Sequence, residues 1–370
     1  MSKVVISGTG VFTPPNVISN EELVTSFNRY VAEEIVGPNP NTTLAESSAD
    51  FILKASGIRQ RFVMDRDGIL DVDRMRPHFE PRSDNELSLQ AEMSLSACRE
   101  ALKAAGREGS EIDAVLVACS NHQRSYPAIA IELQQALGAE GFAYDMNVAC
   151  SSATFGLAQA VALIKSGMCR KALVVSPEIC TGHLNFRDRD SHFIFGDACT
   201  AVLLEASDET RATRVWEVVD TKLSTTFSNN IRNNLGFLSR CEDRPEGDPA
   251  LLFYQEGRKV FKEVTLMVTS LLSCHLKDNG LTSDDLKCMW LHQANASMNA
   301  LIAKKLLGRE PNDLEAPTIL DEYANTSSAG SIIAFHHHQA HLGDGDIGLI
   351  CSFGAGYSIG SVLVKKRDLG

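Results

Sequence analysis

Two stretches of the sequence decide the fold: Ala149-Cys150-Ser151-Ser152-Ala153 and Asn325-Thr326-Ser327-Ser328-Ala329. Each opens a helical pattern of apolar residues, which ends at Lys165-Ser166-Gly167 in the first case and at Leu342-Gly343 in the second. Each helix is followed by an apolar run typical of a buried strand, residues 171–176 and 346–352. The two sets lie about 175 residues apart, whereas solenoid repeats are roughly 20–50 residues long. The sequence therefore predicts two similar αβ halves.

A second pair of segments extends this repeat upstream. Ser110–Asp113 leads into the apolar run 114–119, and Ser283–Leu286 leads into 287–291. Strands that are apolar throughout, rather than alternating, suit a sheet that helices cover on both faces. We therefore expect an α/β protein; chance similarity between two generic αβ units is the alternative interpretation of the repeat.

The predicted halves span residues 1–208 and 209–370. Two segments near 29–48 and 61–85 interrupt the pattern of the first half, and the second of them is rich in charged and polar residues. Long irregular segments inside compact domains are usually lids, binding loops or interface arms. An inert surface excursion is the other interpretation of both segments.

Composition narrows the function. The 370 residues are 44% hydrophobic and carry a formal net charge of −12, which argues against nucleic acid as the main partner because phosphate binding needs a basic surface. No apolar run approaches the ~20 residues that span a bilayer. The first residues lack the apolar stretch of a signal peptide, so we expect a cytoplasmic protein. Its ten cysteines form no CxxC pair and are expected to be free thiols.

Cys150 differs from the other cysteines in its position. It follows the strand-like run 142–147 and lies where a helix begins. A helix N-terminus carries roughly half a positive charge and free N–H groups, which stabilise a thiolate and can hold an oxyanion. We therefore expect a lowered pKa and a nucleophilic thiol at Cys150. An inert buried cysteine near a turn is the alternative.

The second half supplies candidate partners for Cys150. His292 directly follows a predicted strand, and Asn325 precedes a helix at the repeat position next to that of Cys150. If a pseudo-twofold relates the halves, both helix N-termini point toward one centre and these three side chains converge. Gly354-Ala355-Gly356 follows the last of the repeated strands and could bring backbone N–H groups close to a ligand. A structural histidine and a simple turn are the alternatives.

Several motifs now resemble one family, 3-oxoacyl-acyl carrier protein synthase III, over essentially the whole chain. They occur in the family's order: Gly8-Thr9-Gly10 with Pro14, Ser56-Gly57-Ile58-Arg59-Gln60-Arg61, Cys150-Ser151-Ser152, Gly196-Asp197-Ala198, His292-Gln293-Ala294-Asn295, Asn325-Thr326-Ser327 and Phe353-Gly354-Ala355-Gly356-Tyr357. The resemblance implies the thiolase-like fold, in which two pseudo-repeated halves form five αβαβα layers, and a homodimer. It also implies a condensing enzyme of fatty acid or related acyl-chain synthesis.

The resemblance assigns a role to each motif. Cys150 is expected to accept the acyl group of an acyl-coenzyme A, and His292 and Asn325 to promote decarboxylation of malonyl-acyl carrier protein. Backbone N–H groups of Cys150 and Ala355 are expected to form the oxyanion hole. Phe353 matches an apolar residue near the departing carboxylate. The only cofactor-like group implied is coenzyme A, as the thioester substrate, and no metal is expected.

The sequence departs from the family where coenzyme A binds. Phe51 stands in place of an adenine-stacking Trp, and Ala55 and Ser297 stand in place of Arg residues, whereas Arg189 matches the other adenine-stacking position. Tyr126 matches a residue that reaches into the acyl pocket of the partner subunit. These changes favour a primer held more by its acyl tail than by its nucleotide, and we expect a medium straight-chain primer rather than acetyl.

Basic and histidine clusters complete the set of candidate residues. Lys262, Lys304 and Lys305 match positions that meet the acidic carrier protein, although Lys304-Lys305 also suits a solvated helix face. Four histidines are predicted to lie on one helix and to remain solvated, since at most two share a face and two ligands make a poor metal site: His336, His337, His338 and His341.

Other functions remain open at this point. A thiolase would carry His where Asn325 stands and a second catalytic Cys near the last glycines, and Cys351 precedes that loop by three residues. An acyltransferase or condensing enzyme of specialised metabolism, with a non-carrier acceptor, would share the three residues Cys150, His292 and Asn325. A non-catalytic partner subunit of a condensing heterodimer would typically lack the nucleophile.

Overall fold

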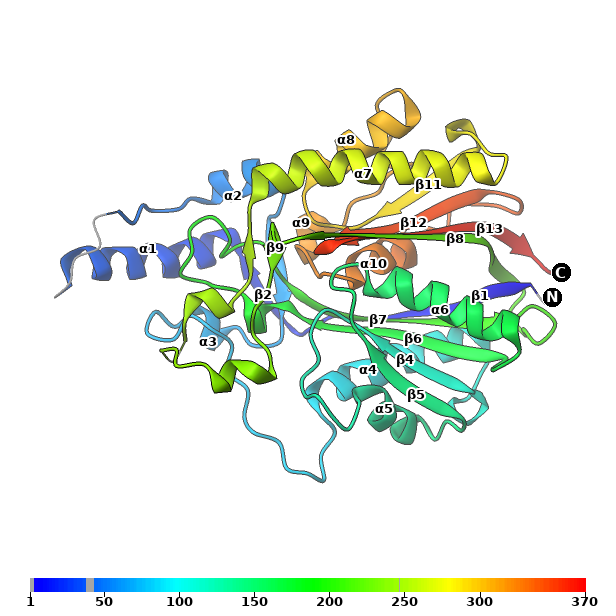
Figure 1. The fold of residues 1–370 in the computed structure, drawn as a ribbon, viewed down its shortest axis with the longest axis horizontal. Helices are drawn as coiled ribbons and strands as arrows, with labels where there is room; N and C mark the ends of the chain where they lie inside the picture. Colours follow the sequence, from blue (N-terminus) through cyan, green and yellow to red (C-terminus); the bar gives the residue numbers. More distant parts are fainter. Residues whose placement is uncertain (1–2, 38–42, 246) are drawn as a thin grey trace.

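The computed structural model describes residues 3–37, 43–245 and 247–370. Its main feature is a nine-stranded mixed sheet in the order β11-β12-β13-β8-β1-β7-β6-β4-β5 (Figure 1). The strands from the first half of the chain are β1 (Val4–Phe12), β4 (Ala114–Ala118), β5 (Phe142–Met146), β6 (Lys171–Ile179) and β7 (Asp197–Ala206). Those from the second half are β8 (Arg214–Ser228), β11 (Leu286–Leu291), β12 (Ile347–Gly354) and β13 (Gly356–Asp368).

The strand order repeats between the halves. In the first, β4 pairs parallel with β6, β6 antiparallel with β7, and β7 antiparallel with β1. In the second, β11 pairs parallel with β12, β12 antiparallel with β13, and β13 antiparallel with β8. The halves join where Val5 and Ile6 of β1 pair with Glu217 and Trp216 of β8. The second half has no named strand equivalent to β5 among the described residues.

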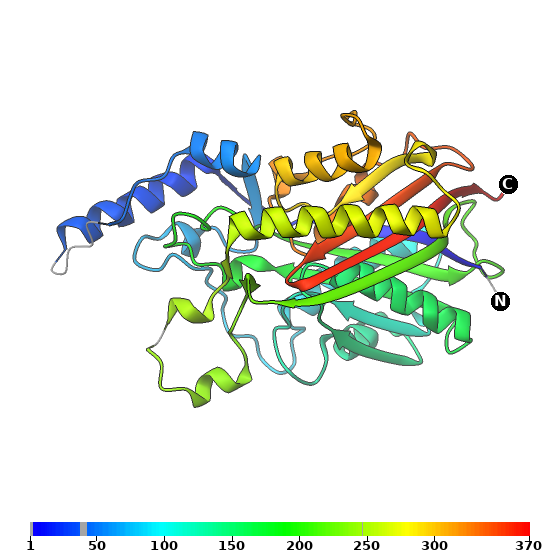
Figure 2. The same ribbon diagram turned by 45° about the horizontal axis from the view of Figure 1, so that its top comes forward.

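Helices cover both faces of each half and give five layers (Figures 1 and 2). The outer helices of the first half are α4 (Leu89–Ala105) and α5 (Ile129–Leu137), and those of the second are α7 (Gly257–Asp278) and α8 (Ala296–Leu307). Between the halves lie α6 (Ser152–Ser166) and α10 (Ala329–His337). Helix α6 contacts β4 and β6 on one side and β12 and β13 on the other. The predicted αβαβα arrangement is therefore confirmed.

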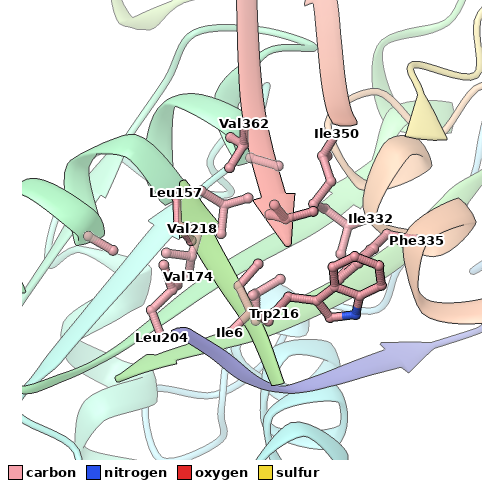
Figure 3. Close-up of a cluster of buried hydrophobic side chains, with 14 of the residues drawn as sticks. Ile6, Leu157, Val174, Leu204, Trp216, Val218, Ile332, Phe335, Ile350 and Val362 are labelled. Atoms are coloured by element: carbon pink, nitrogen blue, oxygen red, sulfur yellow. The ribbon is translucent and has the colours of Figure 1, made fainter. Parts of the chain in front are cut away.

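The hydrophobic core between the halves holds these two central helices in place (Figure 3). Trp216, Trp290 and Phe335 meet edge to face, with ring centroids 4.8–5.6 Å apart. Leu157 of α6 and Ile332 of α10 pack into the same cluster and are 0–1% exposed. Because the cluster draws on strands of both halves, the N-termini of α6 and α10 are fixed relative to each other.

Helix ends follow local signals in the sequence. The Ser88 side chain caps α4, and the left-handed residues Gly106 and Gly167 end α4 and α6. The predicted helix after Asn325 was too long: α10 ends at His337 rather than at residues 342–343. His338, which follows α10, has a backbone N–H that still bonds to Ala334 O, but the chain then turns away.

The two predicted interruptions contain more regular structure than expected. Residues 29–36 continue α1 (Asn20–Val36), which starts with a capping box between Ser19 and Glu22. Residues 38–42 of the interruption near 29–48 lie outside the described residues. In the segment 61–85, β3 (Gln60–Val63) and α3 (Asp67–Leu70) precede an irregular stretch. Its turn is held by the Asp65 carboxylate, which accepts hydrogen bonds from the N–H groups of Gly68 and His78.

The remaining elements are short. They are β2 (Asn16–Ser19), which pairs with β3, α2 (Ala49–Ser56), the two-stranded pair β9 (Ile231–Arg232) and β10 (Tyr254–Gln255), and α9 (Leu320–Tyr323). Within the described ranges, no helix combines the length and the apolar character that crossing a membrane requires. All ten cysteines are free thiols, and seven of them are buried.

Candidate active site

One cavity of about 610 Å³ brings the three principal candidates together. Cys150, His292 and Asn325 all line it, although they come from three distant parts of the chain. Phe353 and Gly354, at the end of β12, line the same cavity. The rest of its wall is largely aromatic and aliphatic, and includes Phe51, Phe193, Phe195, Phe253, Val260, Phe261, Val264 and Met298.

A residue with positive φ directly precedes both Cys150 and Asn325. Ala149, directly before Cys150, has φ +47°, and Ala324, directly before Asn325, has φ +56°. A non-glycine residue in this region costs roughly 1–3 kcal/mol and persists only where the surrounding structure imposes it. Helices α6 and α10 begin just after these bends. The convergence expected from the repeat is therefore present in the structure.

The Cys150 thiol does not have the lowered pKa that its helix-start position predicted. Burial raises the pKa to about 11, and the negative charge of Glu178 acts in the same direction. The Ser327 hydroxyl and the backbone N–H groups of Ala355 and Cys150 oppose this shift without overcoming it. The prediction was wrong because the helix dipole, worth about 0.3–1 kcal/mol at an exposed site, is smaller than the cost of burying a thiolate.

The glycine loop lies against Cys150. A Cβ atom on Gly354 would come within 2.6 Å of the Cys150 Cβ and 3.0 Å of its Sγ, so only glycine leaves the thiol room at this position. The next residue, Ala355, directs its backbone N–H toward the same sulfur. The backbone N–H groups of Cys150 and Ala355 thus both favour the negatively charged form of the thiol.

His292 is a buried, neutral imidazole. It follows β11 directly, is 2% exposed, and its backbone N–H donates to Cys351 O at 2.7 Å. Burial lowers the pKa of the His292 side chain to about 4, although the nearby Ser327 carbonyl opposes the shift. The ring meets Phe353 edge to face at 5.2 Å between centroids. At neutral pH this ring has one N–H donor and one acceptor nitrogen.

The Asn325 side chain is held in one orientation. Its Oδ1 accepts the backbone N–H of Ser327 at 2.9 Å. Because a backbone N–H can only donate, the atom facing it must be the amide oxygen, and the amide NH₂ is left as a pair of donors. The backbone on either side is fixed as well, since the Asn325 N–H donates to Ile194 O and its carbonyl accepts from Gly196 N–H.

The two residues predicted to stack on adenine contact each other instead. The Arg189 guanidinium lies 4.3 Å from the centroid of the Phe51 ring, and its Nε donates to the Glu46 carbonyl. Phe51 and Ala55 line the cavity, so the departures from the family do face it. Arg258, at the start of α7, lines the same cavity and is a basic residue that sequence reasoning missed.

Tyr126 and the three candidate lysines do not line the cavity that holds Cys150, His292 and Asn325. Tyr126 lies on the loop between β4 and α5, is 85% exposed, and is not among the residues that line the cavity. Lys262 lies on α7 and Lys304 and Lys305 lie on α8, all of them exposed. Lys304 pairs with Glu310.

The histidine cluster is not arranged as predicted. Because α10 ends at His337, His341 lies beyond the helix and shares no helical face with the others. His336 is partly buried rather than solvated, and its Nδ1 is 2.8 Å from the Thr9 hydroxyl. No group of three or more His, Cys, Asp or Glu side chains in the described part of the chain could hold a metal ion.

These features define a class of protein: two thiolase-type halves that bring a cysteine, a histidine and an asparagine to one cavity form a condensing enzyme. Family models described as 3-oxoacyl-[acyl-carrier-protein (ACP)] synthase III and its C-terminal part match residues 144–225 and 276–366. A beta-ketodecanoyl-[acyl-carrier-protein] synthase from Pseudomonas aeruginosa is 56% identical over 348 residues, which cover 92% of this chain and 99% of that protein. The chain belongs to the 3-oxoacyl-[acyl-carrier-protein] synthase III family.

Proteins of lower sequence identity support the same family assignment. A beta-ketoacyl-[acyl-carrier-protein] synthase III from Acidiphilium cryptum is 29% identical over 373 residues, which cover 99% of this chain and 100% of that protein. The solved structure of a 3-oxoacyl-(acyl carrier protein) synthase III from Pseudomonas aeruginosa has a TM-score of 0.76 at 24% identity, covering 98% of each chain. That from Aquifex aeolicus has a TM-score of 0.76 at 23% identity, covering 98% of this chain and 99% of its own.

The family resemblance drawn from the motifs is thus confirmed, and the chain is an acyltransferase of the condensing type. The thiolase alternative has no structural support at Cys351, which is fully buried in β12 and does not line the cavity. The alternative of a non-catalytic partner subunit is likewise set aside by membership of this enzyme family.

Proposed function

We propose that this enzyme condenses a medium straight-chain acyl group, taken from acyl-coenzyme A, with malonyl-acyl carrier protein. The observation that carries the proposal is the convergence of Cys150, Asn325 and neutral His292 on one apolar cavity. The products are 3-oxoacyl-acyl carrier protein, CO₂ and coenzyme A.

The first half-reaction is acyl transfer. The Cys150 sulfur attacks the thioester carbonyl, a new C–S bond forms, and the bond to the coenzyme A sulfur breaks. With a pKa of about 11, the thiol is protonated at neutral pH, so its proton must leave during the attack and ends on the departing coenzyme A thiol. The backbone N–H groups of Cys150 and Ala355 stabilise the oxyanion of the tetrahedral intermediate.

The second half-reaction is decarboxylative condensation. The bond to the malonyl carboxylate breaks, CO₂ leaves, and the electron pair becomes an enolate whose negative charge lies largely on the thioester oxygen. The free amide hydrogens of Asn325 and the single ring N–H of His292 are suitable donors to that oxygen. The enolate carbon then attacks the acyl group on Cys150, the C–S bond breaks, and the departing Cys150 thiolate takes up a proton from water, which restores the thiol. The apolar ring of Phe353 would disfavour the carboxylate and favour loss of CO₂.

A relative and the cavity both support the proposed chain length of the primer. The similar Pseudomonas aeruginosa protein is described as a synthase of a ketodecanoyl product. A ketodecanoyl chain has ten carbons, of which two come from malonyl, so the primer has about eight carbons. The apolar wall supports the same choice, since each methylene that fits is worth about 0.8 kcal/mol.

Three packed rings, those of His183, Phe195 and Phe253, form an aromatic partition at the wall of the cavity. His183 packs against Phe195 and Phe253, and the Phe195 and Phe253 centroids are 4.7 Å apart. Phe195 and Phe253 line the Cys150 cavity, whereas His183 lines a second cavity of about 900 Å³. We propose that these three rings limit the depth available to the acyl tail.

Recognition of the two carriers is proposed from the surface. Arg258 and Phe51 line the cavity, and Arg189 contacts Phe51; together they would receive the phosphates and adenine of coenzyme A once the contact between Phe51 and Arg189 opens. Exposed Lys262, Lys304 and Lys305 would meet the acidic carrier protein. A homodimer is supported by β5, which is an edge strand of the sheet, and by the exposed ring of Tyr126.

Intact-protein and peptide mass spectrometry after mixing with acyl-coenzyme A thioesters tests the proposal. We expect acylation on Cys150 alone, and kcat/KM to peak near eight carbons across primers of two to twelve carbons with malonyl-acyl carrier protein saturating. The Cys150→Ser variant is the control. Label on Cys351, or on the serine variant, would contradict the assigned nucleophile. A maximum at acetyl would contradict the chain length, and equal turnover with malonyl-coenzyme A would contradict the carrier-bound acceptor.

A further inference from the structure

Glu178 is a fully buried carboxylate in a strand that is otherwise mostly apolar. It lies on β6, is 1% exposed, and has no part in the half-reactions described above. It has no cationic partner among its hydrogen-bonded neighbours, which are Ser120 and Ser328, with the Cys180 thiol 3.8 Å away. Burying an unpaired carboxylate is costly, so the hydrogen bonds it accepts must be important to the structure.

The two oxygens of the Glu178 carboxylate accept hydrogen bonds from different groups. Oε1 accepts the backbone N–H of Ser120 at 3.0 Å, the backbone N–H of Ser328 at 3.2 Å, and the Ser328 hydroxyl. Oε2 accepts the Ser120 hydroxyl. Glu178 therefore ties the segment after β4, in the first half, to the start of α10, in the second half.

Ser328, which Glu178 holds, lies in the same turn as Asn325, the proposed donor to the enolate. Ser328 is adjacent to Ser327, whose backbone N–H fixes the orientation of the Asn325 amide. The Ser327 carbonyl also faces the His292 ring. A shift of this turn would therefore misplace the Asn325 donor and change the surroundings of His292 together.

We propose that Glu178 is a positioning residue for the decarboxylation step: it holds the turn from Asn325 to Ser328 so that the amide NH₂ of Asn325 faces the cavity. This inference rests on the proposed function, because it assumes that Asn325 binds the enolate oxygen. Activation of Cys150 is not its role, since its negative charge raises the pKa of that thiol.

The structure suggests a conservative variant and a matched pair of serine variants. In Glu178→Gln, the amide oxygen can keep the Oε1 position and accept both backbone N–H groups, while the NH₂ donates to the Ser120 hydroxyl, which can accept. Glu178→Ala removes every one of these bonds. Ser328→Ala removes one hydroxyl bond to the carboxylate on the Asn325 side and a longer one to the Ala118 carbonyl. Ser120→Ala removes one hydroxyl bond to the same carboxylate on the opposite side and the bond that Ser120 accepts from the Asn121 amide.

The experiment measures two rates for each variant: acylation of Cys150 by octanoyl-coenzyme A, and CO₂ release from malonyl-acyl carrier protein. We expect Glu178→Ala to lose about 10²-fold in CO₂ release, the cost of a displacement of about 1 Å, while acylation stays within about threefold of wild type. Glu178→Gln should restore most of the loss. Ser328→Ala should slow CO₂ release by more than Ser120→Ala does, with unchanged melting temperatures for both.

The outcomes separate this inference from the proposed function. If the wild-type enzyme is neither acylated nor able to release CO₂, the proposed function fails. If the wild type does both, equal loss of acylation and CO₂ release in Glu178→Ala would overturn the positioning role. If Glu178→Ala does not fold, the serine pair decides: equal effects of Ser328→Ala and Ser120→Ala on the ratio of the two rates would overturn it.

Discussion

Gly354→Ala changes the active site by a single methyl group at the point where the glycine loop meets Cys150. The backbone of Gly354 is not in the left-handed region, so alanine is conformationally acceptable there. The obstacle is steric, since the new Cβ would lie 2.6 Å from the Cys150 Cβ and 3.0 Å from its Sγ. Neither neighbour can easily move, because Cys150 precedes α6 and Gly354 ends β12.

The magnitude follows from these distances. Carbon atoms in contact are ordinarily about 3.5–4.0 Å apart, so relief of the clash requires a movement of about 1 Å. Displacing a reacting group by that amount can cost about 10²-fold in rate. Overpacking of this kind also lowers the free energy of unfolding by roughly 1–3 kcal/mol. We therefore expect Gly354→Ala to fold with a reduced melting temperature and to acylate Cys150 about 10²-fold more slowly.

The assay is the rate of octanoyl transfer to Cys150, followed by mass spectrometry at substrate concentrations well below KM. Gly343→Ala is the matched control, because a Cβ there would have its nearest neighbour 3.9 Å away, at the Asp346 carboxylate. The control should acylate at the wild-type rate. Acylation of Gly354→Ala within about threefold of wild type, with an unchanged melting temperature, would refute the argument that this contact positions the thiol.

Three further predictions follow from the site. Asn325→Ala should lose about 10²–10³-fold in malonyl decarboxylation while octanoyl labelling of Cys150 persists; parallel loss of both would contradict the division between the half-reactions. Because the Cys150 pKa is raised to about 11 and only the thiolate reacts, iodoacetamide labelling of the free enzyme should rise about tenfold per pH unit between pH 7 and 9, and a plateau near pH 8 would disprove it. Phe253→Ala, which opens the aromatic partition, should move the kcat/KM maximum to primers longer than eight carbons; an unchanged profile would remove Phe253 from the proposed limit.

The repeat was visible in the sequence because it depends on local patterns. The apolar runs that became β4, β6, β11 and β12, and the small-residue stretches that open α6 and α10, are each encoded within a few neighbouring residues. Their spacing predicted two similar halves, and the neighbouring repeat positions of Cys150 and Asn325 predicted one site between the halves. The length of α10 was predicted less well, because residues 338–343 are compatible with a helix but are not packed as one.

Local sequence patterns could not predict the protonation states of the Cys150 thiol and the His292 ring. The helix-start position singled out Cys150, which does line the cavity. It gave the wrong direction for the pKa of the thiol, because desolvation depends on every neighbour that surrounds it. Glu178 gave no signal of its importance, since its partners Ser120 and Ser328 are far away in the chain. The contact between Phe51 and Arg189 was likewise invisible, although both residues had been identified.

The sequence by itself determined the family, the two-half architecture and the three residues that meet at the cavity, because these reside in ordered motifs and in the period of the apolar pattern. Only the tertiary structure decided the protonation of Cys150 and His292, the orientation of the Asn325 amide and the shape of the apolar wall. The physical reason is that local conformation depends on neighbours in the chain, whereas burial, hydrogen bonding and charge depend on neighbours in space.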